Sequence, residues 1–166
     1  KDFENRENIE KLGEYDGILV PGGFGETGIE GKLKAIQYAR ENKIPYFGLC
    51  YGMQLMVVEY ARNVLGLEGA HTVEINPEAP HPIVAMMDAQ KEVLARGEYG
   101  GTMRLGVYKE KIVPGTIAHK AYGKDEVEER HRHRYEINPA YVPKLSEAGL
   151  VFSGPSPDAV LMEIAE

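Results

Sequence analysis

A cysteine lies between two glycines at the spacing of a catalytic turn. Residues 48–52 read Gly-Leu-Cys-Tyr-Gly, between an apolar run that ends at residue 49 and an amphipathic pattern that follows. This is the Gly-x-nucleophile-x-Gly elbow, in which a tight strand-to-helix turn strains the central residue and the flanking glycines relieve the clash. Cys50 is the only cysteine, so it forms no disulfide within the chain. A lone cysteine is more often a small buried hydrophobe, but these neighbours favour a nucleophile.

The same turn would supply the groups that a thiol nucleophile needs. It places Cys50 at a helix N-terminus, where the dipole favours the reactive thiolate, and it directs the backbone N–H of Tyr51 towards a developing oxyanion. Residues 21–25, Pro-Gly-Gly-Phe-Gly, follow the preceding strand, so both turns should open at one sheet edge, where Gly23 can offer a second N–H. A phosphate cradle is the competing interpretation. The loop, however, lacks the Gly-Lys-Ser/Thr ending of a P-loop and the G-x-G-x-x-G spacing.

Apolar patterns predict the elements that position these residues. Strands are expected at 17–20, 45–49, 83–86, 105–108, 133–137, 150–153 and 160–164, and helices at 33–42, 53–64 and 141–148. Residues 88–99 show neither pattern and are expected to form a mobile excursion. Because strands and helices alternate in the first part, we predict an α/β fold of the flavodoxin-like kind, with a doubly wound, mostly parallel sheet and flanking helices.

Composition limits the class of protein. The 166 residues fit one domain over 1–166, and the formal net charge of -7 argues against a nucleic-acid-binding surface. No apolar run is long enough to span a membrane and no signal peptide opens the chain, so a cytoplasmic location is expected. The chain begins without Met and stops directly after an expected strand. We therefore expect a domain fragment that is incomplete at both ends.

Several motifs together resemble one known family. They are residues 20–25 (Val-Pro-Gly-Gly-Phe-Gly), 38–42 (Tyr-Ala-Arg-Glu-Asn), 44–54 (Ile-Pro-Tyr-Phe-Gly-Leu-Cys-Tyr-Gly-Met-Gln), 100–106 (Gly-Gly-Thr-Met-Arg-Leu-Gly) and 129–136 (Glu-Arg-His-Arg-His-Arg-Tyr-Glu). This set resembles the class I glutamine amidotransferase domain of CTP synthases. The cysteine elbow is shared by all class I amidotransferases, whereas the last two motifs are particular to CTP synthases.

The resemblance implies a role for each matching residue. Cys50 would attack the side-chain amide of L-glutamine to give a thioester and ammonia, with the N–H groups of Gly23 and Tyr51 as the oxyanion hole. The positions that hold the α-amino and α-carboxylate groups of glutamine match Gln54, Glu74 and Arg134. Phe24 and Arg104 match positions that receive GTP, the allosteric activator.

The resemblance also implies what the full enzyme does. It is a glutamine-hydrolysing ligase in which a synthetase domain, absent from this chain, uses ATP and Mg²⁺ to aminate UTP to CTP. The amidotransferase domain itself carries no cofactor, and the family implies homotetramers. Tyr51 replaces the usual leucine, which should alter pocket shape more than chemistry.

The catalytic base is expected on a His-Pro-Glu segment that the family carries after the strand at 160–164. None of the five histidines matches that position, so the chain as written is expected to be a poor glutaminase. Two alternatives therefore stay open: a non-catalytic regulatory or assembly module that retains the glutamine pocket, and a stand-alone cysteine hydrolase of the DJ-1/PfpI type.

The basic run at 130–134 has several interpretations besides a carboxylate clamp. It could be a solvated charged face, a nucleic-acid patch, or a metal pair formed by His131 and His133. The acidic chain argues against nucleic acid, and the run offers no convincing third metal ligand. No metal site is therefore expected.

Overall fold

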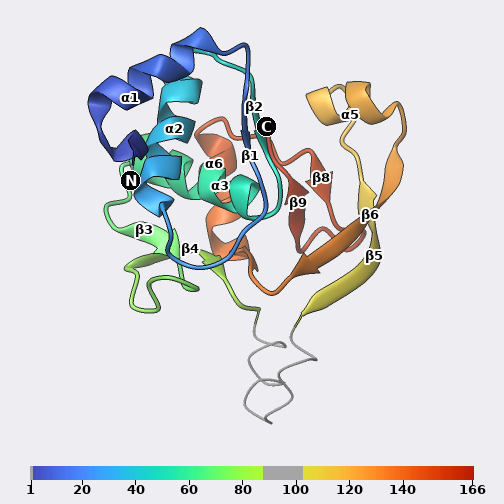
Figure 1. Cartoon of the computed structure of the whole chain (residues 1–166). Coiled ribbons are helices and arrows are strands. Elements are labelled where there is room, and N and C mark those ends of the chain that lie inside the picture. The colour runs from blue at the N-terminus through green and yellow to red at the C-terminus, as the bar shows by residue number, and fades with distance from the viewer. Residues whose placement is uncertain (1, 88–102) are drawn as a thin grey trace. The chain divides into compact units, whose positions relative to one another are not determined.

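The computed structural model describes residues 2–87 and 103–166. The chain divides into two compact units, Lys1–Ile83 and Val84–Glu166, and each is described by itself. Figure 1 shows the elements of both units. None of the helices among the described residues has the length and apolar character needed to cross a membrane.

The first unit combines a parallel strand pair with two long helices. Its elements are η1 (Asp2–Glu4), α1 (Arg6–Glu10), η2 (Lys11–Glu14), β1 (Ile18–Val20), α2 (Ile29–Glu41), β2 (Tyr46–Gly48), α3 (Tyr51–Asn63), β3 (Ala70–Thr72) and the start of β4 (His81–Ala85). β1 and β2 are parallel, and Val20 pairs with Gly48, so both strands end at the same edge. The loop after β1 and the turn after β2 therefore emerge side by side, as predicted.

The helices α2 and α3 bury their apolar stripes in the core of this unit. Fully buried side chains include Ala39, Leu55, Val57, Val58 and Ala61. One charged group lies among them: Glu59 of α3 is 0% exposed, and Arg40 of α2 binds it through Nε and Nη2, with the shortest contact at 2.8 Å. Because a buried carboxylate needs its charge and lone pairs satisfied, this ion pair joins α2 to α3.

The second unit consists mainly of antiparallel pairs. Its elements are β5 (Arg104–Lys111), α5 (Ile117–Tyr122), β6 (Glu126–His133), β7 (Glu136–Ile137), η4 (Pro139–Tyr141), α6 (Val142–Glu147), β8 (Gly154–Pro155) and β9 (Met162–Ile164). β5 and β6 form a long hairpin that pairs Arg104 with His133 and Lys111 with Glu126. The end of β4 pairs with β7, and β8 pairs with β9.

The α/β fold class is confirmed, with its parallel pair at β1 and β2. Strands or helices lie within or close to most of the predicted ranges. α2 begins at Ile29, earlier than predicted, and the strand predicted at 133–137 is divided between β6 and β7. β3 and α5 were not predicted. The excursion predicted at 88–99 lies outside the described residues.

Candidate functional site

Cys50 occupies a strained turn between β2 and α3. Its φ is 50° and its ψ is -102°, a conformation that a residue with a side chain rarely adopts. The turn is held from both sides, because Leu49 N–H donates to Val20 O at 3.0 Å and Gln54 N–H donates to Cys50 O at 3.1 Å. Cys50 is exposed and occupies the N-cap position of α3. The elbow predicted from the sequence is therefore present in its geometry.

The two flanking glycines are required by close backbone contacts. A Cβ on Gly48 would lie 2.6 Å from the Gly52 carbonyl carbon and from Met53 N. A Cβ on Gly52 would overlap the carbonyl oxygen of Val20. No side chain fits at either position without moving the backbone of the turn.

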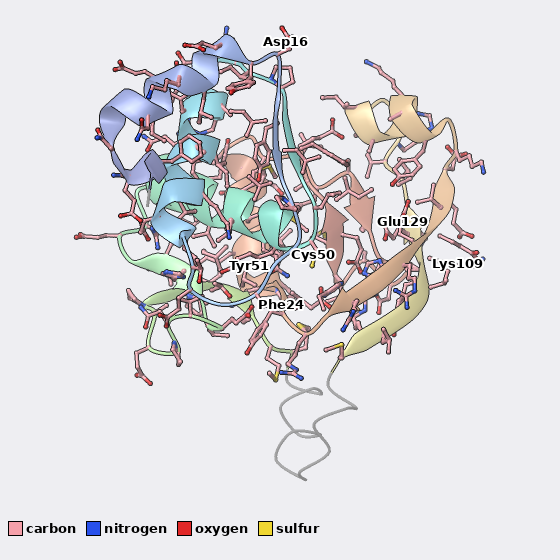
Figure 2. The ribbon with its side chains drawn as sticks, viewed as in Figure 1. Asp16, Phe24, Cys50, Tyr51, Lys109 and Glu129 are labelled. Atoms are coloured by element: carbon pink, nitrogen blue, oxygen red, sulfur yellow. The ribbon has the colours of Figure 1, made fainter. Side chains whose placement is uncertain are left out.

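The loop at 21–25 lies directly beside the cysteine. A Cβ on Gly22 would be 3.7 Å from Cys50 Cβ, and one on Gly23 would be 3.6 Å from Tyr51 Cδ1. Figure 2 shows Cys50 and Tyr51 at the start of α3, with Phe24 on the neighbouring loop. The two expected oxyanion donors, the N–H groups of Gly23 and Tyr51, thus belong to adjacent segments that flank the thiol.

The Tyr51 side chain fixes this loop. Its ring is 1% exposed and its hydroxyl donates to Gly25 O at 3.1 Å. Burial, followed by the charge of Glu74, raises the pKa of Tyr51 to about 12, so the hydroxyl keeps its proton and remains a donor. The ammonium of Lys32 lies 5.4 Å from the ring centroid. The sequence analysis assigned Tyr51 only a backbone role and an effect on pocket shape, because its partner lies 26 positions away.

Glu74 and Gln54 lie in the same unit as the cysteine. The Glu74 carboxylate accepts the Gly25 N–H at 3.3 Å, so Glu74 contacts the loop that flanks Cys50. Gln54 is 6% exposed and stands one helical turn after Cys50. Phe24 is 68% exposed, so its ring is open to solvent.

Arg134 and Arg104 belong to the second unit. Arg134 Nε is buried and, among the described residues, has no hydrogen-bond partner. A buried donor without a partner carries a desolvation penalty that an anionic ligand would remove. Arg104, in contrast, is engaged: its Nη1 binds Glu136 at 3.3 Å and Glu163 at 2.5 Å, and its guanidinium stacks 4.3 Å from the Tyr108 ring centroid.

A network of titratable groups surrounds Arg104. The hydrogen bond that His131 donates to Glu110 raises the pKa of His131 above its usual value, whereas burial lowers the pKa of His133 to about 4. Burial, with the charge of Glu163, raises the pKa of Glu136 to about 7. Glu163 was not predicted as part of any cluster, because it stands 30 positions beyond His133 and no local pattern marks it.

Comparison with known proteins identifies the family of this chain. The family model for class I glutamine amidotransferases matches residues 1–166. A CTP synthase of Carboxydothermus hydrogenoformans is 58% identical over 162 residues, which cover 97% of this chain and 30% of that protein. A CTP synthase of Sulfurisphaera tokodaii is 56% identical over 166 residues, covering 99% of this chain and 30% of that protein. The chain therefore spans about a third of the length of these relatives.

A solved structure shares both fold and sequence. The glutaminase domain of Trypanosoma brucei CTPS with bound acivicin superposes with a TM-score of 0.84 at 43% identity, covering 95% of this chain and 58% of that one. Family, sequence and fold agree over nearly the whole chain. The chain belongs to the class I glutamine amidotransferase family and corresponds to the glutaminase domain of CTP synthases.

Proposed function

We propose that this chain hydrolyses the side-chain amide of L-glutamine, with Cys50 as the nucleophile. The observation that carries the proposal is the backbone of Cys50, held at positive φ on the N-terminus of α3 by two glycines that admit no side chain. That geometry leaves Cys50 exposed at the N-cap position of the helix. Strain of this kind persists where the surrounding structure imposes it, which is common at active sites.

In this proposal the reaction proceeds through a thioester. The Cys50 thiolate attacks the amide carbon, and the negative charge that develops on oxygen is stabilised by the N–H groups of Gly23 and Tyr51. The C–N bond then breaks and ammonia leaves with a proton from a general acid, a role that the family gives to its His-Pro-Glu segment. Water attacks the thioester, which releases glutamate and regenerates the thiol.

The α-ammonium and α-carboxylate groups of glutamine need protein side chains of opposite charge. Glu74 offers a carboxylate for the α-ammonium, with Gln54 as a neighbouring polar group, and Arg134 offers a guanidinium for the α-carboxylate. The buried, unpartnered Arg134 Nε supports the second assignment, since a carboxylate oxygen would complete its hydrogen bonding. The contact of Glu74 with the loop beside Cys50 supports the first.

The wider reaction belongs to the longer enzyme. We propose that the ammonia passes to a synthetase domain of the same enzyme, where ATP and Mg²⁺ support amination of UTP to CTP. GTP would act as activator through Phe24 and Arg104, and the full enzyme would assemble as a tetramer. The CTP synthases that match this chain over about a third of their length support this context.

Labelling with an electrophilic glutamine analogue such as acivicin tests the proposal. Intact mass and peptide mapping should show one adduct per chain on Cys50, and excess glutamine should slow its formation. Iodoacetamide, which needs only an accessible thiolate, should label Cys50 without needing the groups that hold the amino acid.

Arg134→Met is the informative variant. It should lose labelling by the analogue while retaining labelling by iodoacetamide, because only the analogue needs the carboxylate clamp. One outcome would contradict the proposal. If Cys50 of the folded original chain reacts with iodoacetamide but not with the analogue, even without added glutamine, the chain is better explained as a module without glutaminase function.

A further inference from the structure

Three side chains of the second unit converge on one point although they come from separate strands. His131 and His133 lie two positions apart on β6 and so share a face of the hairpin, while Glu163 arrives on β9. His131 Nδ1 is 2.7 Å from His133 Nε2 and 3.6 Å from Glu163 Oε2. The three side chains are 9%, 13% and 3% exposed. The other face of the hairpin, where Lys109 of β5 lies (Figure 2), is open to solvent.

The hydrogen bonds around the two imidazoles leave a gap between them. His131 Nε2 meets the buried carboxylate of Glu110 at 2.7 Å, so this nitrogen carries a hydrogen. His133 Nδ1 meets the carbonyl of Tyr135 at 3.2 Å and therefore also carries one. In neutral rings, His131 Nδ1 and His133 Nε2 then face each other as two lone pairs. A positive centre, either an additional proton or a metal ion, would relieve this contact of 2.7 Å between two lone pairs.

We propose that this cluster binds a divalent transition-metal ion of the zinc type through His131 Nδ1, His133 Nε2 and Glu163 Oε2. Two imidazole nitrogens and one carboxylate oxygen are a donor set that suits Zn²⁺, and the three ligand atoms lie within 4.8 Å of one another. Bonds of about 2.0–2.2 Å place two ligand nitrogens about 3.3 Å apart. The two rings must therefore separate by about 0.6 Å, which side-chain torsions can provide.

The surroundings resemble an outer shell of metal ligands. Glu110 and the Tyr135 carbonyl each hold the far nitrogen of one imidazole, which fixes the ring and directs the other lone pair inwards. The opposing charge is Arg104, which binds the other oxygen of Glu163. Two carboxyl groups, those of Glu136 and Glu163, contact this one guanidinium, and a third, that of Glu110, contacts His131. An added divalent cation therefore meets an excess of acidic groups.

The metal site is inferred from contacts within the second unit and does not rest on the proposed glutaminase function. The motif at 130–134 predicted no metal site because it supplies only two ligands. The third ligand comes from a strand 30 positions further along the chain, which sequence spacing could not reveal.

Metal titration of the chain in a Cys50→Ser background, which removes the competing thiol, tests the proposal. Co²⁺ should bind with a stoichiometry of one per chain and give visible d–d absorption bands, and Zn²⁺ should abolish these bands by displacement. His133→Asn and Glu163→Gln should each weaken binding at least about tenfold. His119→Gln alters a histidine–carboxylate pair on the surface and should leave the affinity unchanged.

Nitrogen NMR of the histidines supplies a readout that does not depend on variants. On Zn²⁺ addition, His131 Nδ1 and His133 Nε2 should change chemical shift, while the remaining histidines stay constant. The proposal is overturned if the folded Cys50→Ser protein binds no metal at millimolar concentration. It is equally overturned if the shifts occur only at other histidines, or if His133→Asn and Glu163→Gln, both folded, bind as tightly as the background protein.

Discussion

At Gly52, the first turn of α3 packs so closely against the carbonyl of Val20 that no side chain fits between them. The same contact holds the backbone of Cys50 at positive φ, since the turn has no room to relax. Gly48 has an equivalent constraint from the other side. At the residue scale, therefore, the backbone position of Cys50 depends on having glycine, with no side chain, at both position 48 and position 52.

Gly52→Ala should destabilise the protein by about 2–4 kcal/mol, because the new methyl group overlaps the Val20 carbonyl and the backbone must move. Urea denaturation measures the free energy of unfolding. Gly31→Ala is the matched control, since Gly31 also lies in a helix and its added Cβ would be 3.6 Å from the nearest atom, Phe3 Cβ. The control should be neutral or stabilising by up to about 1 kcal/mol. Equal effects of the two substitutions would contradict the steric account.

His71 should make the stability of the protein depend on pH. Burial, with the charge of Arg62, lowers its pKa below the ordinary value of 6.5, and its Nδ1 accepts the Thr72 N–H at 2.9 Å. As pH falls below 6.5, the unfolded chain takes up the proton first, so the folded state loses stability down to its own lower pKa. Above 6.5 both states are neutral at this residue and its contribution is constant.

His71→Asn isolates this contribution, since an amide oxygen can accept the same N–H without titrating. The free energies of unfolding of the two proteins should be compared by urea denaturation between about pH 5 and about pH 7.5. The original protein should lose stability relative to His71→Asn as the pH decreases. A constant difference across this range would show that His71 titrates alike in both states.

The elbow was predictable because its steric rule is local: two glycines and a cysteine within five residues define it. The anchoring of the loop at 21–25 by the Tyr51 hydroxyl was not predictable, since its acceptor is a backbone carbonyl that only the fold brings close. Glu163 was not predicted because its partners, Arg104 and His131, lie on other strands. Residues whose partners lie within a few positions can be assigned from sequence, and those whose partners lie on another strand cannot.

At the scale of elements, α2 and α3 are joined by a charge as well as by apolar packing. Glu59 is fully buried and depends on Arg40, with Asn63 adding a further hydrogen bond at 3.0 Å. Periodicity predicted both helices because their apolar residues recur at helical spacing. The periodicity did not indicate the ion pair between Arg40 and Glu59. The β6 strand was largely missed because most of its side chains are polar, so pairing with β5, rather than an apolar alternation, defines it.

Arg40→Met should cost about 2–4 kcal/mol in the free energy of unfolding, because it leaves the Glu59 carboxylate buried without a countercharge. Adding Glu59→Leu should recover most of this loss, since the double variant buries no unpaired charge. Lys109→Met breaks an exposed pair with Glu126 and should leave the free energy of unfolding nearly unchanged, because solvent screens that pair. If the double variant is no more stable than Arg40→Met, the cost comes from lost packing rather than from the charge.

At the scale of the whole molecule, the chain corresponds to about a third of each matching CTP synthase. In the proposed function, the product of this chain that the rest of the enzyme would use is ammonia. Blocking glutamine hydrolysis alone should therefore leave the amination of UTP by added ammonia intact. This difference between the two activities distinguishes a catalytic role for Cys50 from a structural one.

In a full-length CTP synthase that carries this chain as its glutaminase domain, Cys50→Ala should abolish glutamine-dependent CTP formation. Formation from added ammonium chloride should remain within about twofold of the original rate, because free ammonia bypasses the thioester step. CTP formation with each nitrogen source, measured at saturating ATP and UTP, gives both rates from one preparation. Retained glutamine-dependent activity would show that Cys50 is not the nucleophile. Loss of both activities would assign Cys50 a role in holding the enzyme together, because neither the synthetase step nor ammonia entry requires its thiol.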